Sequence, residues 1–170
     1  MNRVQMIEYL NLLYQTNELH KKAFNLKEHF VEIPQLLSQY IAITLLGLSK
    51  YSGKGKTFDA EKSISGILNY YEIKATSSPN GAASINYKKR SNVLVWVHVD
   101  VVNQKVFVRQ RMGFDLIKRK KELYNVNPTK LIKLVNPLTR KKPFSTTMKN
   151  IKWDSTITSF DFASPPSQFI

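Results

Sequence analysis

The chain contains no cysteine among its 170 residues. Disulfide bonds and thiolate metal sites are therefore excluded, and a cytoplasmic protein is the default expectation. Long hydrophobic runs are missing as well, since the longest one, Ile41 to Leu48, is interrupted by Thr44 and is too short to cross a bilayer. The first residues lead directly into a helical pattern that includes Glu8, so no signal peptide is expected.

Acidic residues are scarce relative to basic ones. The chain has 12 Asp and Glu against 26 Lys and Arg, a formal net charge of +14. Residues 1–85 hold 9 basic and 7 acidic side chains, a net of +2, whereas residues 86–170 hold 17 and 5, a net of +12. A basic half of this size repels itself unless it meets an anionic partner, and nucleic acid is the most common one. A membrane surface is disfavoured because no basic amphipathic helix with an aromatic apolar face is present.

The length and the apolar content of 42% predict one globular domain over residues 1–170. Apolar residues at helical spacing predict helices over 2–15 and 18–30. Pro34 then begins a strongly apolar helix that is expected to end near Gly47. The domain thus divides into N-terminal helices (1–32), a core (33–109) and basic C-terminal elements (110–170).

The core pattern after this helix predicts strands. Thr57–Lys62 and Ile67–Ala75 flank a turn at Ser63–Gly66, which together indicate a β-hairpin. Val93–Val99 is an almost continuous apolar run, typical of a central strand covered on both faces. The remaining predictions are a short helix or irregular crossing at 82–92, a strand at 105–109, helices at 114–124 and near 127–134, and strands near 151–153 and 156–162. The expected fold class is α/β (α+β), with a central mixed sheet flanked by helices.

The strand Tyr70–Ala75 carries the pair of charges that draws most attention. Side chains two positions apart on a strand share a face, so Glu72 and Lys74 point together to one side, away from Tyr71 and Ile73. Alone, such a pair is most simply a surface ion pair. The other arm of the predicted hairpin adds two carboxylates, Asp59 and Glu61.

Asp59, twelve intervening residues and then Glu72-Ile73-Lys74 resemble the catalytic signature of the PD-(D/E)xK nuclease superfamily, which includes most type II restriction endonucleases. The resemblance covers residues 33–109 and the order helix, hairpin, buried strand. It departs at Phe58, where the motif has proline. It departs again at Gln39, where many relatives carry a helix glutamate that faces the metal.

The resemblance implies a Mg²⁺ site held by Asp59, Glu72 and the backbone carbonyl of Ile73, with Lys74 beside the attacking water and the scissile phosphate. Hard oxygen ligands of this kind are those that Mg²⁺ prefers. A metal ion at such a site activates water and neutralises charge on the phosphate oxygens. Gln39 is the expected holder of a bound water, which favours one metal over two. Glu61 remains the alternative to Asp59 as ligand.

Other polar residues have simpler interpretations. His98 lies in the apolar strand and is expected to be a core histidine with its hydrogen bonds satisfied. Asp100 is expected to cap or form a turn. His20 and His29 have no third ligand at metal spacing. The DNA-binding residues expected from the basic segments are Lys54, Lys56, Lys88, Lys89, Arg90, Arg109, Arg111, Arg119, Arg140 and Lys141.

The sequence thus predicts a small Mg²⁺-dependent type II restriction endonuclease that acts on double-stranded DNA. Family behaviour implies a homodimer, because two active sites and a palindromic target allow both strands to be cut. A structure-specific or non-specific repair nuclease or resolvase of the same superfamily is the first alternative. The second is a non-catalytic nucleic-acid-binding protein in which Glu72 and Lys74 form a structural ion pair.

Overall fold

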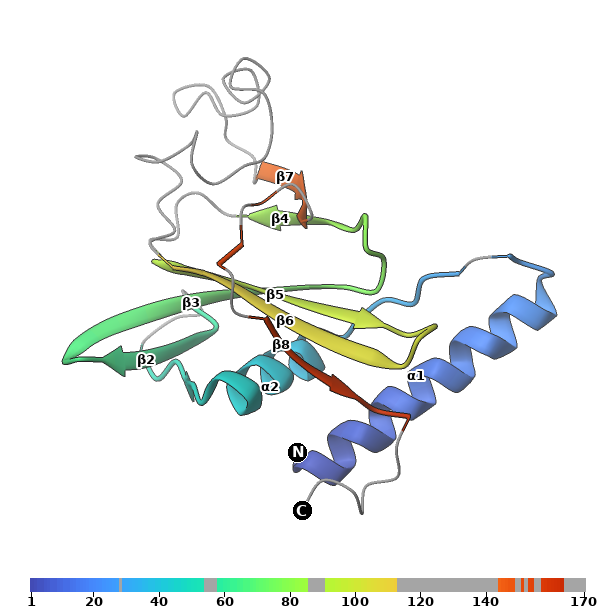
Figure 1. The fold of residues 1–170 in the computed structure, drawn as a ribbon, viewed down its shortest axis with the longest axis horizontal. Helices are drawn as coiled ribbons and strands as arrows, with labels where there is room; N and C mark the ends of the chain where they lie inside the picture. Colours follow the sequence, from blue (N-terminus) through green and yellow to red (C-terminus); the bar gives the residue numbers. More distant parts are fainter. Residues whose placement is uncertain are drawn as a thin grey trace.

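A mixed six-stranded sheet forms the centre of the computed structural model, which describes residues 1–27, 29–53, 58–85, 91–112, 144–148, 151, 153–154 and 157–163 (Figure 1). The sheet order is β1-β2-β3-β5-β6-β8. Neighbouring strands are antiparallel except β3 and β5, which are parallel. The six strands are β1 (Ser49–Lys50), β2 (Ala60–Ile64), β3 (Ile67–Thr76), β5 (Val93–Asp100), β6 (Lys105–Met112) and β8 (Ile157–Asp161). The fold is therefore α+β with a mixed, curled sheet, as the sequence predicts.

The first helix, α1 (Arg3–Ala23), is longer than expected. Asn2 accepts a hydrogen bond from the Gln5 amide at 2.9 Å, and the Gln5 side chain accepts one from the Asn2 amide at 2.8 Å, which forms a capping box. The helix predicted over 2–15 is confirmed as part of α1, whereas the prediction of a second helix over 18–30 is wrong, because α1 continues without a break and ends at Ala23. No glycine or proline interrupts the chain near residue 16, and the helix continues until Asn25 adopts a φ of 52°.

The second helix, α2 (Gln35–Leu46), begins and ends as predicted. Pro34 stands at its N-cap position, where the missing amide hydrogen costs nothing. Gly47 closes it in the left-handed conformation with a φ of 59°, which glycine adopts without a steric penalty. Among the described residues, neither helix is long and apolar enough to span a membrane.

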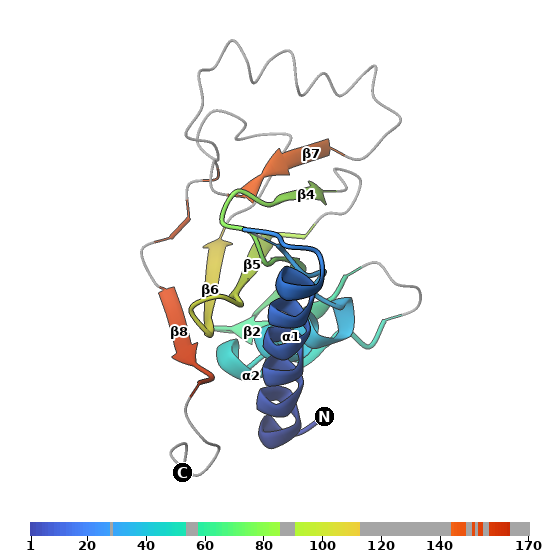
Figure 2. The same cartoon turned by 90° about the vertical axis from the view of Figure 1, so that its right-hand side faces the viewer.

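Both helices contribute to a core on one face of the sheet, and Figure 2 shows α1 in front of α2 and β2. Met6 and Leu10 of α1 and Ile41 of α2 are buried together with the alternate β5 residues that start at Val93. The buried pattern of β5 extends from Val93 to Val99, so the prediction of a strand covered on both faces is confirmed.

The predicted hairpin is present, with its turn two residues later than expected. Ser63 and Ile64 still pair with β3, and the turn consists of Ser65 and Gly66. Both turn residues have positive φ, 52° and 79°. Two-residue hairpins favour this arrangement because its twist matches that of the flanking strands.

A second, two-stranded sheet lies on the opposite side of β5 from α2 (Figure 1). Its strands are β4 (Ala82–Ile85) and β7 (Phe144–Thr147), which are antiparallel. The prediction of a short helix or irregular crossing over 82–92 is therefore wrong for Ala82–Ile85, because β4 finds a partner far along the chain, and residues 86–90 lie outside the described residues. The strands expected at 105–109 and 156–162 are confirmed as β6 and β8. The helices expected at 114–124 and near 127–134 lie outside the described residues.

The packing of α2 can be tested with two adjacent leucines. Leu37 is 1% exposed and Leu36 is 74% exposed. We expect Leu37→Ala to lower the free energy of unfolding by about 2–5 kcal/mol, because it leaves a cavity in the core. Leu36→Ala deletes the same side-chain atoms at an exposed position. It should change the free energy of unfolding by less than about 0.5 kcal/mol. Urea denaturation followed by circular dichroism measures both, and equal losses would contradict the described packing.

Candidate functional site

The two faces of β3 differ as the alternation in its sequence predicts. Tyr71 and Ile73 are buried in the core with the helices, and burial raises the pKa of the Tyr71 phenol. Glu72 and Lys74 point to the other face. On that face Glu72 lies opposite Leu94 of β5, and Lys74 lies opposite Trp96.

Glu72 and Lys74 form an ion pair that is far from an ordinary surface pair. Lys74 Nζ lies 2.7 Å from Glu72 Oε1. The Glu72 side chain is 2% exposed and that of Lys74 is 24% exposed. A carboxylate withdrawn from water to this extent requires a charged partner or hydrogen bonds. Lys74 supplies the charge and keeps part of its own surface in contact with solvent.

Asp59 lies directly before β2 and contacts β3 on both sides of Glu72. Its amide donates to the Tyr71 carbonyl at 3.0 Å. Its Oδ2 accepts from the Ile73 amide at 2.7 Å. The β2–β3 ladder ends with the Ala60–Tyr71 pair, so the Ile73 amide has no strand partner on this edge and the Asp59 carboxylate takes that place. Asp59 is thus bonded to the residues directly before and after Glu72.

Gln39 reaches the same carboxylate from the helix layer. Its Nε2 donates to Asp59 Oδ1 at 2.9 Å, which links α2 to the start of β2. This glutamine was predicted to face the site from the helix. The structure therefore links Gln39, Asp59 and the Ile73 amide by hydrogen bonds, and it pairs Glu72 with Lys74 on the residues either side of Ile73.

Glu61, the alternative to Asp59, lies farther along β2. It is opposite Tyr70, and its Oε1 accepts from Ser52 Oγ at 3.2 Å. Of the two carboxylates, only that of Asp59 bonds to the main chain beside Glu72 among the described contacts, so Asp59 is the better placed of the two to join Glu72 in a site.

Residues outside the predicted ligand set hold the hairpin in place. Phe58 stacks on Tyr70 with ring centroids 4.4 Å apart and planes at 13°, which fixes the chain immediately before Asp59. Asn92 receives a hydrogen bond from the Tyr70 amide and donates to Asn69 Oδ1 at 2.7 Å. An asparagine directly before a buried strand is a recognisable signal for such local bonding.

The arginines predicted to contact DNA have intramolecular partners where the structure describes them. Arg109 lies with its Cζ 5.3 Å from the centroid of the Trp96 ring. Arg111 forms an ion pair with Asp154 at 3.1 Å, and the Met112 amide donates to the same carboxylate at 2.8 Å. The other predicted DNA-binding residues lie outside the described part of the chain: Lys54, Lys56, Lys88, Lys89, Arg90, Arg119, Arg140 and Lys141.

His98 is buried but not satisfied as predicted. Its ring lies between Trp96, at 5.3 Å, and Phe107, at 5.8 Å, and both are nearly parallel to it. Within the described residues its Nε2 has no hydrogen-bond partner. Burial lowers the pKa of His98 below the ordinary value of 6.5, and this outweighs the opposite effects of Asp100 and of a bond with the Ser77 backbone.

The donor set at Asp59 and Glu72 fits Mg²⁺ better than zinc. Among the described residues no group of three His, Cys, Asp or Glu side chains has the geometry of a metal site. Mg²⁺ needs only one or two carboxylates, with water and substrate completing its shell. A residue in an antiparallel ladder directs its N–H and C=O to the same side, so the Ile73 carbonyl lies at the edge that Asp59 occupies.

The bond between Asp59 and the Ile73 amide can be tested directly. We expect Asp59→Ala to accelerate hydrogen exchange of the Ile73 amide about ten- to hundredfold, because a charge-assisted bond is lost. Glu61→Ala, which removes a carboxylate two residues away, should leave this rate unchanged. Exchange followed by NMR resolves single amides, and the Val95 amide in the buried centre of β5 reports any global loss of stability. The same response in both variants would contradict the geometry.

The lowered pKa of His98 predicts a pH dependence of stability. The folded state favours the neutral imidazole, so below pH 6.5 the unfolded chain binds more protons at this position than the folded one. The contribution of neutral His98 to the stability of the folded state is complete above pH 6.5. It is lost as the pH falls through the lowered pKa that His98 has in the folded state. An NMR titration of the His98 ring, assigned with His98→Gln, should give a midpoint below 6.5. A midpoint at or above 6.5 would show that burial does not dominate.

Comparisons with known proteins add no family to this description. No protein-family model matches the chain, and neither the curated proteins nor the solved structures give a match. The interpretation of the site therefore rests on its own residues and geometry.

Proposed function

We propose that the chain is a Mg²⁺-dependent endonuclease that cuts double-stranded DNA, most like a small type II restriction enzyme of the PD-(D/E)xK superfamily. The observation that carries the proposal is the position of Asp59, which contacts the main chain at Tyr71 and Ile73 on either side of Glu72. Asp59 and the Glu72–Lys74 ion pair therefore lie at the same end of the β2–β3 hairpin.

The carboxylates of Asp59 and Glu72 and the carbonyl of Ile73 would hold the metal ion. When bound, Mg²⁺ would lower the pKa of the attacking water and neutralise charge on the phosphate. The carboxylates are already oriented without a metal ion, because Glu72 is buried and Asp59 is hydrogen-bonded to both Gln39 and the Ile73 amide. Because its hydrogen bonds orient it beforehand, little reorganisation is needed when substrate arrives.

Lys74 is the residue with a role in proton transfer and charge stabilisation. It is on the same face as Glu72, and its side chain is 24% exposed, so its ammonium group is held by the pair and still open to solvent. From there it would orient the attacking water and stabilise the negative charge that grows on the phosphate in the transition state.

The rest of the chain supports a DNA substrate. The order α2, β2–β3 hairpin and buried β5 is the order on which the resemblance to the proposed superfamily is based. Residues 86–170 carry a net charge of +12, which suits a phosphate backbone. A homodimer that acts in the cytoplasm follows from the proposal, since each strand of the duplex needs an active site.

The proposal predicts that Lys74→Ala lowers DNA cleavage by about a hundredfold or more, because the transition state loses its proton-transfer and charge-stabilising group. DNA affinity should fall by less than about tenfold, since only one positive charge is lost. Plasmid cleavage with Mg²⁺ and a gel-shift assay with EDTA measure the two effects. Lys105→Ala is the matched control, because Lys105 is an exposed lysine on β6 and its removal changes the charge equally.

Cleavage at near wild-type rate by the Lys74→Ala variant would show that this active site is wrong. The products separate the alternatives. Discrete metal-dependent bands from plasmid support a restriction enzyme, whereas smearing, or cutting of branched DNA only, supports a repair nuclease or resolvase. Binding without cleavage under any metal condition would leave a non-catalytic DNA-binding protein, with Glu72 and Lys74 as a structural pair.

A further inference from the structure

A cavity of about 460 Å³ lies at the carboxyl ends of the only parallel pair in the described sheet, β3 and β5. The loops that follow these strands line it through Ser77, Pro79 and Asn80 on one side and Val101 to Asn103 on the other. The end of α1 and the segment after it supply the opposite wall. In open sheets, ligands bind in the crevice outside the carboxyl ends of parallel strands. The volume falls within the range of small-molecule sites.

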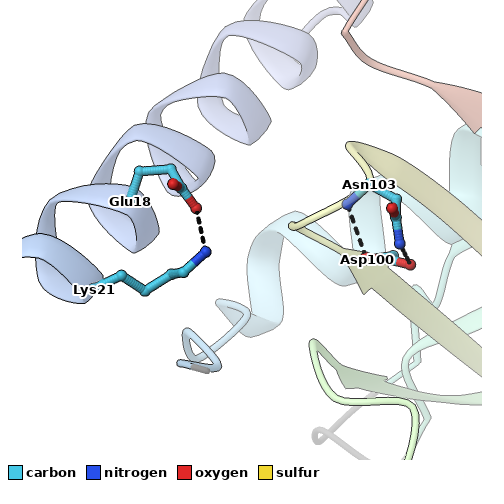
Figure 3. A network of polar contacts seen from close by, with 4 residues as sticks. All are labelled: Glu18, Lys21, Asp100 and Asn103. Atoms are coloured by element: carbon cyan, nitrogen blue, oxygen red, sulfur yellow. Dashed lines mark hydrogen bonds and ion pairs between the residues drawn. The ribbon is translucent and has the colours of Figure 1, made fainter. Parts of the chain in front are cut away.

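The α1 wall of the cavity is basic. Lys21 and Lys27 line it, and so does His29, whose Nε2 is hydrogen-bonded to His20 Nδ1 at 3.1 Å, which leaves its Nδ1 for a ligand. Lys21 is neutralised in part by Glu18, whose Oε1 lies 2.9 Å from its Nζ (Figure 3). Lys27 has no hydrogen-bond or ion-pair partner in the part of the chain that the structure describes. A cation without a partner at a cavity wall favours an anionic ligand.

The opposite wall is polar and already ordered. Asp100 Oδ1 accepts from the Asn103 amide at 3.0 Å, and Oδ2 accepts from Asn103 Nδ2 at 2.8 Å, which confirms the prediction of a turn residue (Figure 3). Each oxygen retains a lone pair for a donor on a ligand. This wall therefore suits the hydroxyl or amino groups of a ligand whose anionic end lies against the lysines.

An aromatic side chain also faces the cavity. Phe30 lines it and is 45% exposed, so its ring is open to stacking.

We propose that this cavity binds one nucleoside monophosphate unit, with the phosphate on Lys21, Lys27 and His29, the base on Phe30 and the sugar toward Asp100. The unit is either a free nucleotide or the 5′-phosphorylated end of a DNA strand, since the chemistry that recognises them is the same. The site lies outside the Asp59–Glu72 centre and does not depend on DNA cleavage.

Isothermal titration calorimetry of the full chain in EDTA tests the proposal, with adenosine 5′-monophosphate, adenosine and a 5′-phosphorylated oligonucleotide as probes. We expect the monophosphate or the oligonucleotide to bind and adenosine to bind at least about tenfold more weakly, because it lacks the charge-assisted bonds. Tighter binding of the monophosphate identifies a free nucleotide as the ligand, and tighter binding of the oligonucleotide identifies a strand end.

Lys27→Gln should weaken binding by about tenfold or more, and Phe30→Ala should weaken it as well. Lys22→Gln is the matched control, because Lys22 is an exposed lysine near Lys21 that does not line the cavity. Lys22, Lys27 and Phe30 are all exposed, so folding should be unaffected, which thermal unfolding checks. No binding of either phosphate probe, equal binding of adenosine, or equal losses in Lys27→Gln and Lys22→Gln would overturn the proposal.

Discussion

The unpaired edge of β3 at Ile73 is the constraint on which the candidate site depends. The β2–β3 ladder stops at Tyr71, and a buried amide beyond that point must find an acceptor. The Asp59 carboxylate supplies it at 2.7 Å, and Gln39 then holds the second oxygen. The need of the Ile73 amide for an acceptor thus determines where the Asp59 carboxylate lies relative to Glu72. The same hydrogen bonds link α2, the start of β2 and β3.

Burial explains why Glu72 and Lys74 differ from a surface ion pair. The strand β5 is covered on both faces, and Glu72 lies beside its Leu94, which is fully buried. A carboxylate there retains its charge only with close compensation, and Lys74 provides it. A protein that needs only stability gains little from such a pair, because hydrophobic residues of similar size pack at least as well. A role in chemistry on a charged substrate, as proposed above, gives a reason for such a pair.

The region around the β2–β3 hairpin and the carboxyl ends of β3 and β5 carry different side chains. On the hairpin side, the acidic groups gather around β3. At the carboxyl ends of β3 and β5, the loops and the end of α1 enclose a cavity with a basic wall. Between them, Trp96 joins the strands by donating to Thr76 Oγ1 at 2.9 Å, and Arg109 covers its ring. The single parallel pairing in the described sheet creates this division, because it places two strand ends and their loops at one edge.

The sequence by itself determined the features that depend on neighbours a few residues apart. Pro34 and Gly47 define the ends of α2, alternation assigns Glu72 and Lys74 to one face, and an apolar run marks β5. Tertiary structure alone decided the rest, since it depends on residues distant in the chain. It made β4 a strand by pairing it with β7, and it placed the Asp59 carboxylate, rather than that of Glu61, on the Ile73 amide. Local periodicity cannot encode these choices, because hydrogen-bond partners across a sheet are set by register and packing.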